Sequence, residues 1–501
     1  MGRPTIPRIC FGWLTAFALA ACSAPGGPPG SEPQTASARS ASEQRIGAQN
    51  HPKIVAEFGG EVQNRALRAY VDGIGRRLVA QTEQPNARWT FTVLDSPVVN
   101  AFALPGGYVY VTRGLIALAN DEAELAGVIG HEIGHVVAAH SAQRQTQAGL
   151  AQIGALGVSL LGAAAGLSGQ ALNTVSQLGS TLGQGYVASY SRTQEFEADQ
   201  LGVRYLARAG YDPRAEADFL ANLQAEARLQ AQIAGGGYNP NRVDFFSTHP
   251  ATPERVREAT AAAERQVDAA GALRNRARFL DAISGMVYGH SPDQGVVDGR
   301  RFSHAALRFN FTAPTGFRIR NTAAKVIATG PQGSGIIFDG DRSGGGAMDD
   351  YIARAWAPEI ARQTRAGQLQ NLRRSRIGGL DAASAVLPVQ TGDGVKILRM
   401  TAIRDGGSVW RFLGVQPTGA DRLGARMDQA AASFRKLTAA QARRISAQRI
   451  EIHTVAAGET PASLARLTPF RNRAVERFRV LNGLGPRAGL RPGQKVKLVR
   501  R

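Results

Sequence analysis

The stretch His131-Glu132-Ile133-Gly134-His135 constrains this chain more than any other segment. Two histidines four positions apart lie on one face of an α-helix, so both imidazoles can bind one tetrahedral metal ion at about 2.0–2.1 Å. The glutamate beside the first histidine can accept a proton from water on that metal. Asn120 or Asp121 can cap the start of the helix, and Glu124 can complete a capping box. The stretch therefore predicts a zinc site on a helix, with a chance match as the alternative.

The first 22 residues have the pattern of an export signal. Two arginines give a basic start, and residues 9–21 form an apolar run too short to span a membrane. The run ends in Leu19-Ala20-Ala21-Cys22, which resembles the lipobox of bacterial lipoproteins. The resemblance implies that Cys22 becomes acylated and anchors the chain, and Ser23 after it favours the outer membrane. An ordinary cleaved signal peptide is the alternative.

Cysteine content and charge limit the chemistry and the partners. The chain has only Cys10 and Cys22, so the mature chain would have no disulfide and no thiol nucleophile. The formal net charge of +20 favours a polyanionic partner such as lipopolysaccharide, anionic lipid or the cell wall. No motif for nucleic-acid binding is present, and nucleic acid is not expected as a partner. Alternatively, arginine simply keeps this chain soluble.

The length and the hydrophobic patterns predict an α+β chain of several domains. We expect an export signal over residues 1–22, a flexible tether over 23–49, a mostly helical domain with a small sheet over 50–266, a linker over 267–300, an α+β accessory domain of unassigned role over 301–440 and a small, compact domain over 450–501.

Within the helical domain, a helix is expected near residues 60–82, and strands near 89–94, 98–104 and 108–111. Further helices are expected near residues 189–208, from Pro213, and from Thr252-Pro253. The uncharged segment 149–185 is expected to form a helical flap near the site, with a weak membrane span as the alternative. In the accessory domain, strands are expected at 306–311, 335–338 and 395–415, and helices at 348–362 and 422–436.

Catalytic zinc usually has three protein ligands and one open position, so a third ligand is needed. Glu195 in Glu195-Phe196-Glu197-Ala198-Asp199 is the best candidate. On a helix, Glu195 and Asp199 share a face, whereas Glu197 points elsewhere. Asp199 could then accept a hydrogen bond from a ligating histidine and fix its tautomer. An ordinary acidic helix surface is the alternative.

These motifs resemble those of the HtpX/BepA-like zinc metallopeptidases, which are related to the CAAX prenyl endopeptidases. Segments 100–107, 191–192 and 247–250 add to the resemblance, which covers about residues 50–266. It implies a gluzincin-type fold and one Zn²⁺ per chain, with His131, His135 and Glu195 as ligands and Glu132 as the catalytic base. Many relatives carry transmembrane helices, and their replacement here by a lipid anchor argues against a prenylated substrate.

His249 is a further candidate for the site. It could donate to the oxyanion that develops during peptide hydrolysis, fill the open zinc position and hold the enzyme off, or be an ordinary loop histidine. His140, five residues past His135, is expected to be structural. An extended, unfolded peptide could pair with a strand edge near the site. By resemblance, the residues of that edge are Asn100, Ala101, Phe102 and Ala103.

The C-terminal residues resemble a LysM module, a βααβ fold that binds glycans containing N-acetylglucosamine. Segments 453–460, 481–484 and 490–494 carry the resemblance. His453, Pro461 and an arginine-rich middle depart from the usual pattern, and residues 451–501 hold 11 basic and three acidic residues. The resemblance implies peptidoglycan as a partner; ionic contact with other anionic envelope polymers, or no ligand, are alternatives.

Together these features predict a zinc metalloendopeptidase that is lipid-anchored in the cell envelope, faces the periplasm and cleaves misfolded or misassembled envelope proteins. Two alternatives remain. The basic tail suggests a hydrolase of peptidoglycan stem peptides. The second alternative is a non-catalytic, chaperone-like or wall-binding scaffold whose zinc site is blocked by His249 or by residues 149–185.

Overall fold

The structure is a computed structural model that describes residues 41–141, 190–233, 235, 249, 251–266, 272–342, 345–362, 364–391 and 394–501. The expected export signal with Cys22 and the expected flap at 149–185 lie outside these ranges, as do the neighbours of His249 at 247, 248 and 250. Residues 41–49, which we expected to be flexible tether, instead begin helix α1 (Ala41–Glu57). Ile54 of α1 is buried against the adjoining sheet, which explains the order of this helix.

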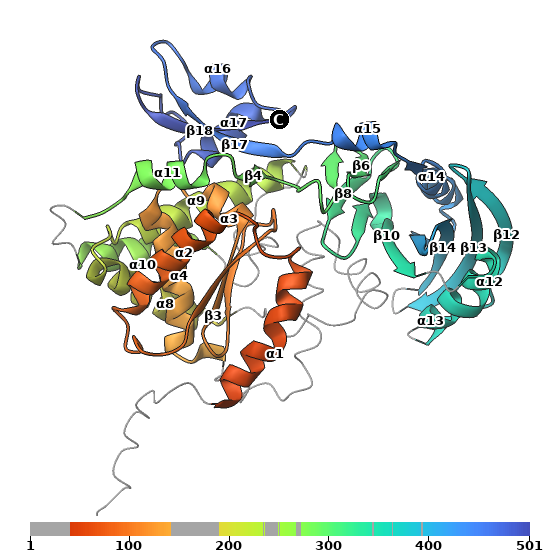
Figure 1. Cartoon of the computed structure of the whole chain (residues 1–501), viewed down its shortest axis with the longest axis horizontal. Coiled ribbons are helices and arrows are strands. Elements are labelled where there is room, and N and C mark those ends of the chain that lie inside the picture. Colours follow the sequence, from red (N-terminus) through yellow and green to blue (C-terminus); the bar gives the residue numbers. More distant parts are fainter. Residues whose placement is uncertain are drawn as a thin grey trace, which may run out of the picture. The chain divides into compact units, whose positions relative to one another are not determined.

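A three-stranded sheet stands beside the N-terminal helices (Figure 1). Strand β1 (Thr90–Leu94) runs parallel to β3 (Tyr108–Thr112), and β3 pairs antiparallel with β2 (Ala101–Leu104). The predicted second strand begins only at Ala101. Before it, the Thr112 hydroxyl donates to the carbonyl oxygen of Val98 and accepts from the backbone nitrogen of Asn100, and only the carbonyl oxygen of Asn100 bonds to the Thr112 backbone. Strands β1 and β2 are the two ends of the strand order. The outer side of β1 is bridged by Glu61 and Val62, whereas β2 has no strand on its outer side within this sheet.

Seven helices of the described residues build the rest of this domain around one apolar core. They are α2 (Arg65–Val79), α3 (Arg113–Leu118), α4 (Glu122–Val137), α8 (Arg192–Arg208), α9 (Ala215–Ile233), α10 (Pro253–Glu264) and α11 (Arg276–Ile283). Helix α10 begins as predicted, because the Thr252 side chain caps it and Pro253 occupies its first turn. Helix α2 begins at Arg65 rather than near residue 60, because Asn64 is its N-cap.

Helices α4 and α8 pack unusually close to each other through small residues. A Cβ added to Gly202 of α8 would lie 3.1 Å from the backbone nitrogen of His131 in α4. A Cβ added to Gly134 of α4 would lie 3.1 Å from the carbonyl oxygen of Ala198 in α8. Glycine at these positions lets the two backbones approach, and short side chains on α8 can therefore reach the histidines of α4.

Residues 267–300, which we expected to be a linker, contain part of the fold. Helix α11 buries Phe279, Leu280 and Ile283 in the core of the N-terminal domain. This spacing places the three apolar side chains on one face of a helix, and their burial explains why the segment is ordered. Strand β4 (Val287–Tyr288) then pairs with β17 of the C-terminal residues.

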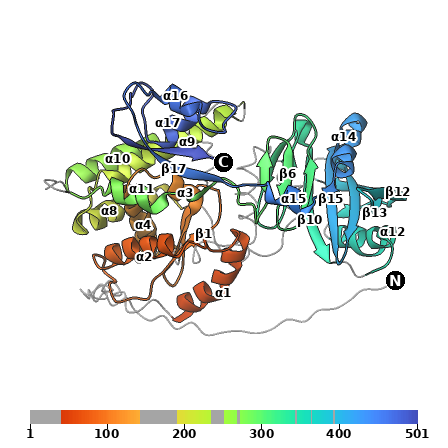
Figure 2. The same cartoon turned by 45° about the horizontal axis from the view of Figure 1, so that its top comes forward.

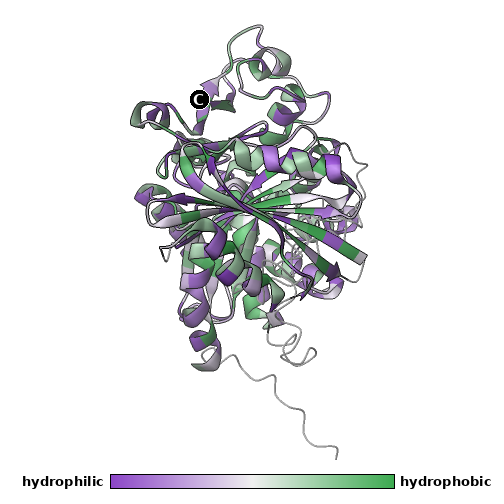
Figure 3. Ribbon diagram, turned by 90° about the vertical axis from the view of Figure 1, so that its right-hand side faces the viewer, coloured by the Kyte–Doolittle hydropathy of each residue, from purple (hydrophilic) through white to green (hydrophobic). Residues whose placement is uncertain are grey.

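The accessory domain contains an eight-stranded sheet whose strands are mostly longer than those of the first domain. In spatial order they are β11 (Arg365–Ala366), β13 (Leu380–Thr391), β14 (Gly394–Asp405), β15 (Ser408–Pro417), β10 (Gly335–Arg342), β9 (Val326–Thr329) and β8 (Arg318–Asn321), with β12 (Gln370–Ile377) paired to β13. Figure 3 shows hydrophobic residues gathered along the central strands of this sheet.

Helices cover the two faces of this sheet. Helix α14 (Asp421–Ala432) contributes to one apolar core, and α12 (Met348–Tyr351), a π-helical turn (Ile352–Trp356) and α13 (Ala357–Ala361) contribute to the other. The predicted strand pair around residue 406 is present as β14 and β15. The predicted strand at 306–311 begins only at Phe309, because residues 305–308 turn between β6 (Arg301–His304) and β7 (Phe309–Thr312).

A smaller sheet joins β16 (Arg435–Lys436), β7, β6 and β5 (Val296–Asp298) in that order. The predicted helix at 422–436 therefore ends early, at Ala432, because its last residues form β16 and pair with β7. A short helix, α15 (Ala439–Arg443), leads from there to the C-terminal residues.

The C-terminal residues fold in βααβ order, the order that the resemblance to a LysM module implies. The elements are β17 (Gln448–Thr454), α16 (Pro461–Ala465), α17 (Ala474–Leu481) and β18 (Lys495–Arg500), with β17 and β18 antiparallel. Figures 1 and 2 both show them beside α3, α9 and α11. Lys497 is fully buried and donates to the carbonyl oxygens of Ala117 at 2.8 Å and Ala119 at 2.6 Å, just before α4.

No helix among the described residues has both the length and the apolar composition needed to cross a bilayer.

Candidate metal centre

Helix α4 carries the histidine pair and is capped by two acidic residues. The Asp121 side chain accepts a hydrogen bond from the backbone nitrogen of Glu124, and the Glu124 carboxylate accepts one from the backbone nitrogen of Asn120. In the expected capping box the Glu124 carboxylate would accept from the backbone nitrogen of the N-cap residue, Asp121; here it accepts from Asn120, one residue earlier. This arrangement fixes the start of α4 and sets the register in which His131, Glu132 and His135 are buried.

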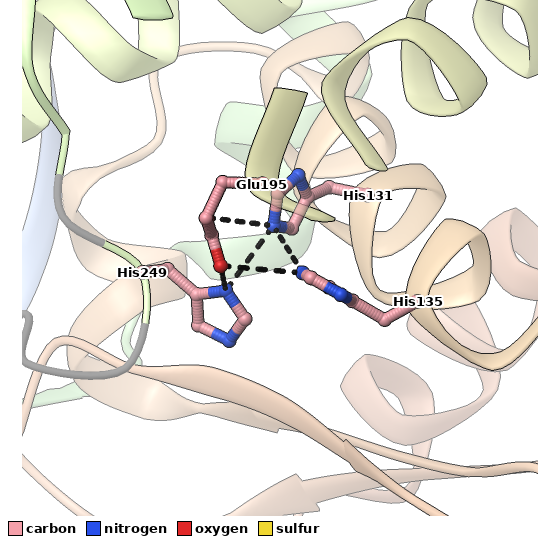
Figure 4. Close-up of side chains that lie close together, drawn as sticks. All are labelled: His131, His135, Glu195 and His249. Carbon is pink, nitrogen blue, oxygen red and sulfur yellow. Dashed lines mark hydrogen bonds and ion pairs between the residues drawn. The ribbon is translucent and has the colours of Figure 1, made fainter. Parts of the chain in front are cut away.

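Four nitrogen and oxygen donors converge on one point (Figure 4). The Nε2 atoms of His131 and His135 are 3.0 Å apart. Glu195 of α8 brings Oε2 to 3.6 Å from Nε2 of His131 and Oε1 to 3.5 Å from Nε2 of His135. His249 adds Nδ1 at 3.2 Å from Nε2 of His131 and at 2.8 Å from Oε1 of Glu195. The three predicted ligands therefore lie together, and His249 lies with them.

These separations fit a tetrahedral metal ion. Ligand bonds of about 2.0–2.1 Å to a tetrahedral zinc ion place its donor atoms about 3.3–3.4 Å apart. The observed separations of 2.8–3.6 Å bracket this range. Two imidazoles and a carboxylate are also a known donor set for catalytic zinc. His131, His135 and Glu195 therefore fit such an ion, and Nδ1 of His249 occupies the fourth position, which would otherwise be open.

Asp199 and Arg255 hold two of these ligands in place. Asp199 Oδ1 lies 2.9 Å from Nδ1 of His131, as expected for a carboxylate that orients a ligating histidine. Arg255 of α10 donates to Asp199 through Nε at 2.8 Å and through Nη2 at 2.6 Å. Its Nη1 lies 2.7 Å from Oε2 of Glu195. One buried guanidinium therefore fixes both carboxylates on the same face of α8.

The electrostatics of the cluster follow from burial and from these pairings. Burial alone would lower the pKa of His131, but the hydrogen bond and the charge of Asp199 outweigh it and raise that pKa to about 9. Burial opposes ionisation of Glu195, yet the charges of His249 and Arg255 hold its pKa well below the usual value. Burial keeps the pKa of His135 well below the usual value. An anionic Glu195 and a neutral His135 are the forms in which these residues bind a metal.

A second layer of side chains surrounds His135. Nδ1 of His140 lies 2.9 Å from Nδ1 of His135, and Nε2 of His140 lies 3.2 Å from Oε2 of Glu197. The ring of Tyr190 stacks on the imidazole of His135 with centroids 3.7 Å apart. We expected His140 to be only structural, but it contacts His135, one of the predicted ligands.

A small pocket opens beside the donor group. Asn100 and Ala101 line it, together with His131, Glu132 and His249. Its apolar lining consists of Leu115, Val128, Phe219, Leu220 and Leu223. The other two residues of the predicted substrate edge do not line this cavity.

The outer two residues of that edge pack into the domain instead. The ring of Phe102 stacks on Tyr110 with centroids 4.8 Å apart and packs against Phe58, the residue that follows α1. Ala103 joins the main apolar core. Side chains alternate along a strand, and only the backbone edge of β2 can serve all four positions.

Nothing in the sequence indicated that three further residues belong to this site: Arg255, Tyr190 and Glu216. Glu216 of α9 lines the cavity, and burial together with the charge of Asp199 raises its pKa to about 7. Arg255 lies six residues after His249 in a charged helix, and nothing in that pattern separates it from a surface arginine. Only the proximity of α10 to α8 identifies its role.

Comparisons with known proteins agree with this geometry. Residues 65–263 match the model for Peptidase family M48. The chain is 36% identical over 199 residues to the putative beta-barrel assembly-enhancing protease of Vibrio cholerae, covering 39% of each chain. It is 32% identical over 202 residues to the beta-barrel assembly-enhancing protease of Escherichia coli (strain K12), covering 40% of this chain and 39% of that one.

A third relative is the mitochondrial metalloendopeptidase OMA1 of Schizosaccharomyces pombe, 30% identical over 220 residues that cover 43% of this chain and 59% of that one. The chain spans about two fifths of the length of the first two relatives. These similarities confirm the resemblance to HtpX/BepA-like metallopeptidases for the part of the chain that carries the donor group.

Proposed function

We propose that this protein is a zinc-dependent metalloendopeptidase of the bacterial cell envelope that hydrolyses misfolded or misassembled envelope proteins. The observation that carries the proposal is the convergence of His131, His135 and Glu195 at separations that suit a tetrahedral ion. The substrate class is supported by the names of two relatives, which are beta-barrel assembly-enhancing proteases.

A zinc ion held by these three residues would act as a Lewis acid towards a peptide carbonyl and would acidify water beside it. Proton transfer would be carried out by Glu132. Within the described residues, its Oε2 is buried and has no hydrogen-bond partner, so this oxygen is available for a proton. Glu132 takes the proton from the attacking water and passes it to the leaving amine. Asp199 and Arg255 keep the ligands oriented throughout.

Substrate would enter as an extended chain. The outer edge of β2 is unpaired within its sheet and begins at Asn100 and Ala101, which line the cavity beside Glu132. Backbone hydrogen bonds along such an edge read extended conformation more than sequence. This recognition suits unfolded segments of many different proteins, which is the substrate class expected of a protease that removes misassembled proteins.

His249 supports a second candidate function, in which the site is held closed. Its Nδ1 occupies the fourth position of the donor group, and its Nε2 lies 3.5 Å from Oε1 of Glu132. In this arrangement a single imidazole occupies the space that water and a peptide carbonyl need. The protein would then act as a scaffold until His249 leaves, and as a protease afterwards.

Location and wall binding are also part of the proposal. Lipidation of Cys22 would tether the protein to the outer membrane, because residues 1–22 carry an export signal that ends in a lipobox. The βααβ tail would bind peptidoglycan as LysM modules do, or other anionic polymers of the envelope. Its element order and its excess of basic residues support this assignment.

Metal analysis combined with a cleavage assay tests the function. We expect wild type to bind one zinc and to cleave an unfolded substrate such as casein. His135→Ala and Glu195→Ala should lose the metal and the activity, whereas Glu132→Gln should keep the metal and lose only the activity. Zinc retained at wild-type affinity in Glu195→Ala, or cleavage by Glu132→Gln, would refute the assignment. Release of muropeptides from purified sacculi would instead favour the peptidoglycan hydrolase.

A further inference from the structure

His140 is not one of the four residues of the donor group, but it contacts one of them, His135. The residue is fully buried, at 0% exposure, although it follows the end of α4 by three positions. One ring nitrogen contacts His135 at 2.9 Å, and the other contacts Glu197 of α8 at 3.2 Å. The Glu197 side chain is 55% exposed. An imidazole thus bridges a metal-binding histidine and a carboxylate at the surface.

Only one arrangement of protons satisfies this chain of contacts. Nε2 of His135 faces the donor group, so it must be unprotonated when it binds a metal, and the proton of a neutral ring is then on Nδ1. That N–H requires an acceptor, which an unprotonated Nδ1 of His140 supplies. His140 in turn carries its own proton on Nε2, which donates to the Glu197 carboxylate. Each group therefore sets the tautomer of the next.

The backbone is strained where it brings His140 into this place. Ala139 has a φ of 53°, in the left-handed region, which costs an L-residue about 1–2 kcal/mol. Such strain persists only where the surrounding contacts hold it, and it is frequent at functional sites. Here it reverses the chain directly after α4, so that the His140 ring turns back onto His135.

We propose that His140 and Glu197 form a relay that orients His135, setting the tautomer and the ring direction with which it binds the metal. The inference rests on the proposed function, because it requires a metal at this site. His131 and His135 are then oriented by different means. Asp199 holds His131 directly, at 2.9 Å, whereas a neutral imidazole backed by Glu197 holds His135. His140 is a positioning residue and does not touch substrate.

Zinc affinity, measured by competition with a chelator, tests the relay. His140→Leu fills a similar volume without an acceptor, and we expect it to weaken zinc binding about 10–100-fold. His140→Asn places an amide oxygen near the position of Nδ1, and we expect it to restore affinity to within a few-fold of wild type. Glu197→Ala should weaken binding by less than His140→Leu. Ala139→Gly, which relieves the strain without touching the relay, is the matched control and should keep wild-type affinity.

A second readout separates orientation from folding. Denaturation of the metal-free proteins shows whether each variant still folds. Glu197→Ala has the lowest risk of a folding defect, because the Glu197 side chain is largely exposed to solvent. Unchanged affinity in both His140→Leu and Glu197→Ala would overturn the relay and leave the metal site standing. Equal losses in His140→Leu and His140→Asn would assign His140 a purely structural role and would also overturn it. Absence of zinc binding by wild type would refute the proposed function itself.

Discussion

Arg255 and Asp199 form a buried ion pair in which the guanidinium donates twice to the carboxylate, through Nε at 2.8 Å and Nη2 at 2.6 Å. The pair joins α10 to α8 directly behind the metal-binding face of α8. Because Arg255 also reaches Glu195, its one positive charge balances two buried carboxylates. Because both carboxylates depend on Arg255, we expect its substitution to destabilise the site more than substitution of any other residue that is not a predicted ligand.

Removing Arg255 should therefore destabilise the protein strongly. We expect Arg255→Met to lower the free energy of unfolding by about 3–5 kcal/mol, because two buried carboxylates lose their partner. Arg255→Lys should be intermediate, because an ammonium keeps the charge but not the planar fork. Urea denaturation of the metal-free proteins measures both effects. The exposed Arg257 of the same helix is the control, and Arg257→Met should change stability by less than about 0.5 kcal/mol.

His249→Ala distinguishes a closed site from an open one. We expect the substitution to increase cleavage of casein, because it clears the fourth position of the donor group while His131, His135 and Glu195 still hold the metal. Zinc content should stay at one per chain. A fall in activity with the metal retained would instead assign His249 to stabilisation of the oxyanion, and unchanged activity would exclude both roles.

Lys497 should contribute to the stability of the N-terminal domain although it lies four residues from the C-terminus. Its ammonium donates to carbonyl oxygens of Ala117 and Ala119 in a fully buried position. Lys497→Met leaves these acceptors without a donor, and we expect a loss of about 1–3 kcal/mol in urea denaturation. Lys495→Met in the same strand removes only an exposed ion pair with Asp281 and should cost less than about 1 kcal/mol. Equal effects of the two substitutions would contradict the prediction.

His290 should make stability depend on pH. Burial and then the positive charge of Arg113 lower its pKa to about 4, so the folded protein keeps this ring neutral at pH 5, whereas the unfolded chain protonates it. Because the folded pKa is the lower one, the stabilising contribution is complete above about pH 6.5 and is lost as the pH falls towards 4. Urea midpoints at pH 7.5 and 5 should therefore fall further for wild type than for His290→Gln. An equal fall in both proteins would rule this cause out.

Local sequence sufficed for the features that depend on neighbouring residues. The spacing of His131 and His135 placed both imidazoles on one face of α4, because four residues are close to one helical turn. The Thr252-Pro253 pair marked the start of α10, because capping depends on residues three positions apart. In the tail, turn signals and alternation marked the helix that begins after Thr460 and the strand near residues 495–499, whereas the full βααβ order came from the resemblance to a LysM module.

Features that depend on distant residues required the tertiary structure. The approach of Glu195 to the histidines depends on glycines that let α4 and α8 pack closely. The sequence alone made Glu195 the best third candidate but left an ordinary acidic helix surface as the alternative. The roles of Arg255 and His140 had no local signal at all. A single arginine or histidine in a helix or turn has the same pattern whether it faces water or a metal ligand.

The sequence by itself thus determined which residues could bind a metal, because ligand type and helical period are local properties. The tertiary structure decided which of them come together, what holds them and which side chain lies at the fourth position, because contacts between residues far apart in the chain arise from packing. His249, 118 positions after His131, shows the difference. The sequence left it as an oxyanion donor, an occupant of the open zinc position or an ordinary loop histidine, and the tertiary structure brings its Nδ1 to 3.2 Å from Nε2 of His131.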